Sequence, residues 1–189
     1  MIGSGAPNRA DGRFSVSVAD ARICDMTDFH VRPARPADHA AVARITVAAY
    51  DADGFLDGDE EYADELSDIA SRSNQATLLV AADEDGTVLG AVTFCRPPSP
   101  YVEVARPGEA EFRMLAVDPA ARGRGVGAAL VQACLDLARE HGDDAVVLSS
   151  LPRMHTAHRL YERLGFVRTP ERDHEPIPGF LLIAYHRRV

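Results

Sequence analysis

Arginine and glycine alternate over one short stretch of this chain, and this stretch carries its strongest functional signal. Residues 117–128 read Val-Asp-Pro-Ala-Ala-Arg-Gly-Arg-Gly-Val-Gly-Ala. An apolar run ends at Val117, and a helical stripe follows at Val126, Leu130, Ala133 and Leu137. The stretch therefore lies where a strand passes into a helix. A helix start has unpaired N–H groups and the positive end of the helix dipole, which together attract anions.

The residue types in this stretch suit a phosphate ligand. Glycine lets a ligand approach the backbone and permits positive φ, and it occurs at Gly123, Gly125 and Gly127. Arg122 and Arg124 add positive charge for phosphate oxygens. The local interpretation is a pyrophosphate cradle. The alternative is a glycine-rich turn before an ordinary helix.

Three types of phosphate loop compete for this stretch. The Walker type needs a lysine at the helix start, and none is present. The dinucleotide type matches at Gly123, Gly125 and Ala128, but five residues separate Val117 from Gly123 and the acidic ribose ligand is missing. The third type, R/Q-x-x-G-x-G/A, fits Arg122, Gly125 and Gly127. It resembles the acetyl-CoA loop of the GNAT superfamily of N-acetyltransferases.

Composition excludes several classes of protein. At 189 residues and 46% hydrophobic content, the chain is expected to form one domain with a real core. The net charge of −9 argues against a nucleic-acid surface. No apolar run approaches the roughly 18 residues of a membrane helix, and the first residues lack a secretory pattern. We therefore expect a cytoplasmic protein that binds neither membrane nor nucleic acid.

The cysteines give no sign of a disulfide or metal framework. Cys24, Cys95 and Cys134 are scattered along the chain. Cys95 and Cys134 are expected as small core residues in a reducing compartment. No spacing among the cysteines and histidines fits a metal site, so no metal is expected.

The hydrophobic pattern orders the elements. Residues 1–28 have no period and are expected as a disordered extension of a domain over residues 29–189. Strands are expected over residues 29–34, 77–82, 87–95, 111–117, 145–148, 166–168 and 180–185. Helices are expected after Pro36, in the second half of the acidic run 51–68, from the glycine loop to about His141, and around 157–164. The order is β-α-α-β-β-β-α-β-α-β-β.

That order resembles the GNAT fold over roughly residues 29–189, and two more motifs strengthen the resemblance. Residues 110–117 are similar to the family's fourth strand, A-E-x-x-x-L-A-V, and residues 157–166 are similar to its A-x-x-L-Y-x-x-L-G-F helix. The resemblance implies an α/β class with a mixed (α+β) sheet. It implies about seven strands with splayed central strands, flanked by about four helices.

The resemblance also implies how acetyl-CoA, the acyl-donor substrate, is bound. Backbone groups of Leu115, Ala116 and Val117 would pair with its pantetheine arm like an added strand. The pyrophosphate would lie on the N–H groups of Arg122, Gly123, Arg124, Gly125, Val126, Gly127 and Ala128. The Leu115 N–H would face the acetyl carbonyl oxygen, where negative charge grows during attack by an amine.

Two further residues fall at the family's catalytic positions. Glu111 would act as the base that deprotonates the amine, through water; alternatively it pairs with Arg113, its same-face neighbour. Tyr161 would protonate the departing thiolate; alternatively it is a core tyrosine. His155 and His158 are expected at the surface. The family often has Asn where this chain has Met154, so that contact is expected to be lost or moved to Ser149, Ser150 or His155.

The acceptor is expected to be a small-molecule amine, a peptide N-terminus or a lysine. It would be bound by the first helices and by the loops over residues 96–108 and 170–179. The acidic run 51–68 could select a cationic acceptor, or it is a solvated, charged helix face. Two rival functions stay open, a non-catalytic acyl-CoA sensor and a structural interaction domain. A homodimer also stays open.

Overall fold

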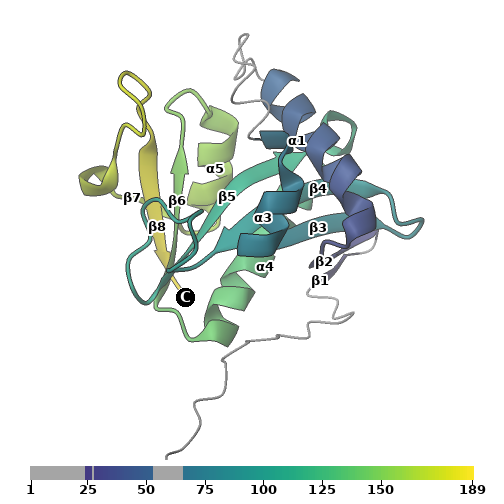
Figure 1. Cartoon of the computed structure of the whole chain (residues 1–189), viewed down its shortest axis with the longest axis horizontal. Coiled ribbons are helices and arrows are strands. Elements are labelled where there is room, and N and C mark those ends of the chain that lie inside the picture. Colours follow the sequence, from purple (N-terminus) through teal and green to yellow (C-terminus); the bar gives the residue numbers. More distant parts are fainter. Residues whose placement is uncertain (1–23, 27, 53–65) are drawn as a thin grey trace, which may run out of the picture.

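The computed structural model describes residues 24–26, 28–52 and 66–189, and these form one eight-stranded sheet covered by helices on both faces (Figure 1). The strand order is β1-β2-β3-β4-β5-β6-β8-β7. The strands are β1 (Cys24–Met26), β2 (Phe29–Pro33), β3 (Thr77–Asp83), β4 (Val88–Cys95), β5 (Glu109–Val117), β6 (Ala145–Ser150), β7 (Val167–Arg168) and β8 (Ile183–Arg188). The α-helices of the described residues are α1 (His39–Ala52), α3 (Ile69–Gln75), α4 (Val126–His141) and α5 (His155–Arg163).

The sheet is mixed, as expected. Neighbouring strands run antiparallel except β5 and β6, which run parallel. The seven expected strands are present as β2 to β8. The extra strand β1 corrects the prediction that residues 1–28 are a disordered extension, because Cys24 pairs with Val31 and Met26 with Phe29. The edge of β2 has unpaired backbone N–H and carbonyl groups, and the three residues of β1 form hydrogen bonds with them. The rest of that extension, residues 1–23 and 27, lies outside the described residues.

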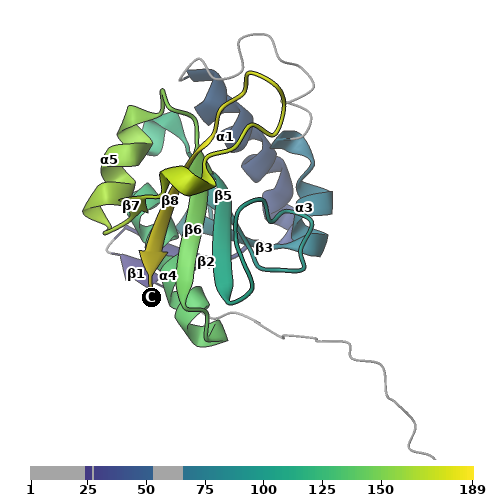
Figure 2. The ribbon, with the colours of Figure 1, turned by 90° about the vertical axis from the view of Figure 1, so that its left-hand side faces the viewer.

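Two apolar layers hold the helices to the sheet. On one face, Val42, Ile45 and Ala49 of α1 and Ile69 of α3 pack on the sheet. On the other face, α4 packs through residues such as Leu130, Val131 and Cys134. Figures 1 and 2 show α1 and α3 on one side of the strands and α4 on the other. Cys95 and Cys134 are buried free thiols, as predicted.

Glycines end two of the helices where the sequence predicted. Gly142 follows α4 with φ 73°, and its N–H donates to the carbonyls of Ala138 and Arg139. Gly165 follows α5 with φ 81°. The last strand was predicted over residues 180–185 but forms at Ile183–Arg188. The error arose because Leu181 is apolar yet 41% exposed, so its hydrophobicity marks a loop rather than the strand.

Gly90 of β4 lets α4 approach the sheet. A Cβ on Gly90 would lie 2.8 Å from the Ala116 carbonyl oxygen and 2.9 Å from Val126 Cγ1. We expect Gly90→Ala to destabilise the protein by about 1–3 kcal/mol, because a close-packed interior must shift to admit the methyl group. The melting temperature measures this. Gly127→Ala is the control, since its Cβ meets nothing nearer than 3.4 Å; an equal or larger loss there would contradict the argument.

Candidate active site

The central strands β5 and β6 pair only at one end. Their register covers Glu109 with Ala145, Ala110 with Val146, and Glu111 with Val147. From Phe112 onward β5 pairs only with β4, on its other side. Backbone groups of alternate residues point to opposite neighbours in a sheet. Because the Asp118 N–H donates to the carbonyl of Leu89 near the start of β4, the backbone groups of Leu115 and Val117 face the open side.

A β-bulge lies where the strands diverge. Ala91 of β4 pairs with Ala116, whereas Thr93 pairs with Arg113, so one residue of β4 faces two of β5. Met114, one of those two, has φ 52°, a left-handed value that is uncommon for a residue other than glycine. A bulge bends its strand and re-aims the following side chains. It therefore helps to turn Leu115 and Val117 toward the opening.

A cavity of about 720 Å³ fills the opening between β5 and β6. Its wall includes Phe112 to Leu115 and Val117 of β5, Ser149 and Ser150 of β6, and Tyr161 of α5. The loop at the start of α4 and Tyr50 of α1 also line it. Segments far apart in sequence thus meet around one space.

The glycine-rich loop forms the wall at the start of α4. Gly123 and Gly125 have φ 81° and 85°, and the position of a Cβ on either has nothing within 4 Å. Gly125 is the N-cap of α4, and no side chain caps that helix start. The loop therefore presents its first N–H groups to an open space that an anion could fill. The residues present fit the pyrophosphate of acetyl-CoA.

Most of the predicted site residues meet at this cavity. Those that line it are Leu115, Val117, Arg122, Gly123, Gly125, Val126, Gly127, Ala128 and Tyr161. Ala116, Arg124 and Glu111 are not part of its wall. Ala116 is buried and faces β4, and Arg124 is exposed on the loop. Sequence reasoning missed Tyr50, Arg153 and Arg163, which also line the cavity. Tyr50 and Arg153 lie outside the three motifs, and Arg163 stands at a variable position of the motif over residues 157–166.

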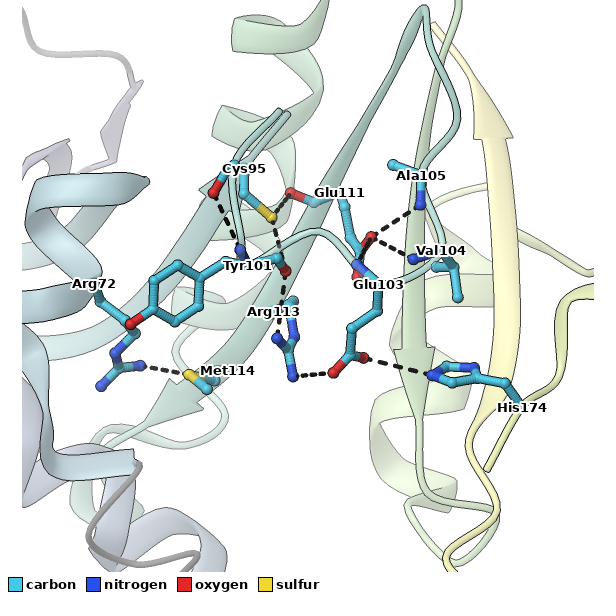
Figure 3. A network of polar contacts seen from close by, with 11 residues as sticks. Arg72, Cys95, Tyr101, Glu103, Val104, Ala105, Glu111, Arg113, Met114 and His174 are labelled. Atoms are coloured by element: carbon cyan, nitrogen blue, oxygen red, sulfur yellow. Dashed lines mark hydrogen bonds and ion pairs between the residues drawn. The ribbon is translucent and has the colours of Figure 1, made fainter. Parts of the chain in front are cut away.

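Glu111 is fully buried and accepts hydrogen bonds that fix the loop over residues 96–108. Its Oε2 accepts hydrogen bonds from the N–H groups of Glu103, Val104 and Ala105 at 3.0, 2.9 and 3.0 Å (Figure 3). Its Oε1 is buried with no hydrogen-bond partner among the described residues. Burial raises the pKa of the Glu111 carboxyl, and the three N–H donors oppose that rise. A raised pKa brings a carboxyl closer to the range in which a base works at neutral pH.

The alternative interpretation of Glu111 proposed a pair with Arg113. In the structure the Arg113 guanidinium instead forms an ion pair with Glu103, with 2.5 Å between Nη2 and Oε1. It also donates to the Tyr101 carbonyl at 3.3 Å. The bulge at Met114 and the course of the loop over residues 96–108 bring these groups together. The sequence predicts the loop but not its course, and it gives no sign of the bulge.

Tyr161 fits both of its interpretations. Its ring packs edge-on against Phe112 at 5.8 Å and Phe166 at 6.1 Å, so it belongs to the core. It also lines the cavity. Burial raises the pKa of the Tyr161 phenol well above its ordinary value, so the hydroxyl keeps its proton at neutral pH.

His158 corrects the prediction that both histidines lie at the surface. Its side chain is buried, and its Nε2 lies 3.1 Å from Ser150 Oγ and 3.1 Å from the Leu151 carbonyl. Ser150 in turn lies 3.4 Å from the Met154 sulfur. His155 is exposed, as expected. Ser149, Ser150, Met154 and His155 all line the cavity beside Tyr161.

Comparisons with solved structures agree with this geometry. A GCN5-related N-acetyltransferase from Kribbella flavida is 31% identical, with a TM-score of 0.59, over 86% of this chain and 98% of that one. A GNAT family acetyltransferase from Brucella melitensis, solved in complex with acetyl-CoA, is 26% identical with a TM-score of 0.55, over 82% of this chain and 86% of that one.

Curated relatives share shorter stretches. An uncharacterized N-acetyltransferase of Schizosaccharomyces pombe is 37% identical over 102 residues, 54% of this chain and 58% of that protein. The N-acetylaspartate synthetase of Rattus norvegicus is 36% identical over 86 residues, 41% of this chain and 29% of that protein. A mycothiol acetyltransferase of Beutenbergia cavernae is 33% identical over 124 residues, 62% of this chain and 39% of that protein. The matches therefore span from 29% to 58% of these relatives' lengths.

A sheet that opens beside a glycine-rich loop at a helix start is suited to binding an acyl-CoA molecule. Residues 40–166 match the acetyltransferase (GNAT) family. The chain belongs to that family of acyltransferase enzymes, in which acetyl-CoA is the acyl donor.

The expectations about a membrane and about the acidic run 51–68 can be compared only with the described residues. No helix within residues 24–26, 28–52 and 66–189 is long and apolar enough to cross a membrane. Most of the acidic run lies over residues 53–65, outside the described residues.

Proposed function

We propose that this protein is an N-acetyltransferase that moves an acetyl group from acetyl-CoA to the primary amine of a small molecule or peptide in a ternary complex. The observation that carries the proposal is the opening between β5 and β6, which joins the anion-binding loop to the open backbone of Leu115 and Val117. The thioester supplies an activated acetyl group. The protein has to bind it, orient it and manage two protons.

Backbone groups would bind and orient the donor. The N–H and carbonyl groups of Leu115 and Val117 would pair with the pantetheine amides, as an added strand does. The loop from Arg122 to Ala128 would hold the pyrophosphate. The Leu115 N–H would donate to the acetyl carbonyl oxygen and stabilise the charge that develops there.

Two side chains would manage the protons. A primary amine has a pKa of about 10 and is mostly protonated at neutral pH, so a base must remove a proton before attack. Glu111 would take that proton through water, because its carboxylate lies off the cavity wall. As the N–C bond forms and the C–S bond breaks, Tyr161 would give its proton to the departing thiolate, which leaves as the free thiol of CoA. The nitrogen, which is positively charged after attack, would lose its second proton to the Tyr161 phenolate, and this restores the phenol.

The acceptor class draws limited support from the relatives. The rat relative is named for an N-acetylated amino acid, which supports a small-molecule acceptor. That match covers only 41% of this chain. Cytoplasmic location and a homodimer remain predictions from the sequence.

CoA release against a broad panel of amines and N-terminal peptides tests the proposal. We expect at least one amine to raise the rate of CoA release well above hydrolysis, with a stoichiometric acetylated product. Tight acetyl-CoA binding with no turnover for any amine would favour the sensor instead. Failure to bind CoA in a calorimetric titration would favour the structural interaction domain and would contradict both other functions.

A further inference from the structure

The charged residues of the cavity wall have one sign. Among the described residues that line it, the charged side chains are Arg113, Arg122, Arg153 and Arg163, and neither aspartate nor glutamate is present. Arg122 belongs to the phosphate loop, and Arg153 and Arg163 lie just before α5 and at its end. Phosphate groups of acetyl-CoA would account for the positive charge of Arg122, Arg153 and Arg163. Arg113 comes from β5, and the phosphate groups do not account for its charge.

Arg113 lies next to the reacting centre. It precedes Leu115, the proposed oxyanion donor, by two residues, and only the bulge residue Met114 stands between them. Its side chain is 18% exposed, so it is neither a surface arginine nor sealed in the core. A group bound by Arg113 would therefore lie close to the amine that attacks the acetyl carbon.

Two contacts orient the guanidinium of Arg113, and they leave some of its N–H groups available to a ligand. Nη2 pairs with Glu103 and Nη1 donates to the Tyr101 carbonyl, as Figure 3 shows. These contacts use two of the five N–H donors of an arginine. A planar guanidinium with fixed orientation matches the two oxygens of a carboxylate.

Glu103 belongs to the loop that Glu111 holds. The Glu103 N–H bonds to Glu111 Oε2, and its carboxylate lies between Arg113 and His174, whose Nε2 is 3.6 Å from Oε2. Glu103 therefore orients Arg113 and offsets its charge while no ligand is bound. An incoming carboxylate would compete with Glu103 for the same guanidinium.

We propose that Arg113 binds a carboxylate of the acceptor, so that the preferred substrates are amines that carry a carboxylate near the amine, as amino acids do. The inference rests on the proposed acetyl transfer. It runs against the cationic acceptor that the acidic run suggested, because a cation at this end of the cavity would face Arg113. Arg113 is thus the residue that sets acceptor specificity.

Matched acceptors test the inference. CoA release is measured with glycine, β-alanine and L-aspartate, and with the amides of their carboxyl groups. We expect wild-type kcat/KM to favour the acids over the amides by about 10- to 100-fold, the range for charge-assisted hydrogen bonds. Arg113→Gln should remove that preference by raising KM for the acids. Arg139→Gln, on α4 and paired with Asp136, is the control and should leave the preference unchanged.

Glu103→Gln separates binding from a merely structural role. Glutamine keeps an oxygen that can accept from Arg113 but removes the competing charge, so KM for the acids should fall several-fold while KM for the amides stays. If Arg113 only anchored the loop, both variants would weaken acids and amides alike. That result, or equal wild-type rates for acids and amides, would overturn the inference.

Product binding keeps the test independent of turnover. N-acetyl-β-alanine and its amide are titrated into the CoA complex of wild type and Arg113→Gln. Tighter binding of the acid, lost in Arg113→Gln, would support the inference even if the amine panel gave no CoA release and the proposed function failed. Equal binding of acid and amide to wild type would overturn it while leaving acetyl transfer intact.

Discussion

Gly125→Glu is expected to abolish acetyl-CoA binding while the protein stays folded. A Cβ at Gly125 would point into open space at the start of α4, so the new carboxylate would occupy the phosphate position and repel the anion. The residue has φ 85°, and a side chain there costs about 1–2 kcal/mol. That cost should lower the melting temperature by a few degrees. Calorimetric titration with acetyl-CoA measures the loss of binding.

Gly142→Glu is the matched control. Gly142 ends the same helix with φ 73°, and its Cβ position also has nothing within 4 Å. Both variants therefore place a side chain at a glycine with positive φ and add one negative charge, but only Gly125→Glu does so at the loop. We expect Gly142→Glu to bind acetyl-CoA like the wild type. Retained affinity in folded Gly125→Glu would remove the basis for placing the pyrophosphate on this loop.

Glu111→Gln is expected to lower kcat by about 10²- to 10⁴-fold, the usual contribution of a general base. Glutamine keeps an oxygen for the N–H groups of residues 103–105, so the loop should stay in place and acetyl-CoA affinity should stay near the wild-type value. The rising limb of the pH–rate profile should move toward the pKa of the amine, about 10, because solvent must then supply the free amine. Steady-state rates from pH 6 to 10 measure both effects.

Tyr161→Phe should lower kcat without moving the rising limb of the pH–rate profile. A tyrosine with an ordinary pKa of about 10 is protonated at neutral pH, and burial raises the pKa of the Tyr161 phenol further. The loss should shrink at high pH, where a thiol with a pKa of about 8.5 can leave as the thiolate. Equal pH profiles for both variants would mean that the roles are misassigned. Near-wild-type rates in both would mean that positioning alone supplies the acceleration.

Local patterns sufficed to place the glycine-rich loop at the start of α4 and to order the strands. Gly125 and the stripe on α4 carry their information within a few residues, since a helix start and a periodic face are local features. Gly142 marked the helix end for the same reason. The seven strands from β2 to β8 followed from runs of apolar residues.

Tertiary contacts decided what the sequence could not give. The burial of Glu111 depends on the course of the loop over residues 96–108, which has no period to follow. The left-handed conformation of Met114 falls on a residue that does not favour it, so no glycine marked the bulge. His158 is buried because it reaches Ser150 on a neighbouring strand. Each case depends on how a loop, a bulge or a helix is placed in three dimensions, which a pattern of apolar residues does not describe.

The short pairing between β5 and β6 divides the sheet into two parts, one formed by β1 to β5 and the other by β6 to β8. Three register pairs join the two parts, and the bidentate ion pair of Glu109 with Arg172, at 2.6 and 2.8 Å, reinforces the paired end. A ligand that bonds to β5 and packs against α5 would connect the two parts of the sheet where β5 and β6 do not pair. Bound acetyl-CoA would then stabilise the sheet as well as react, and it would slow amide hydrogen exchange in both parts by joining them into one cooperative unit.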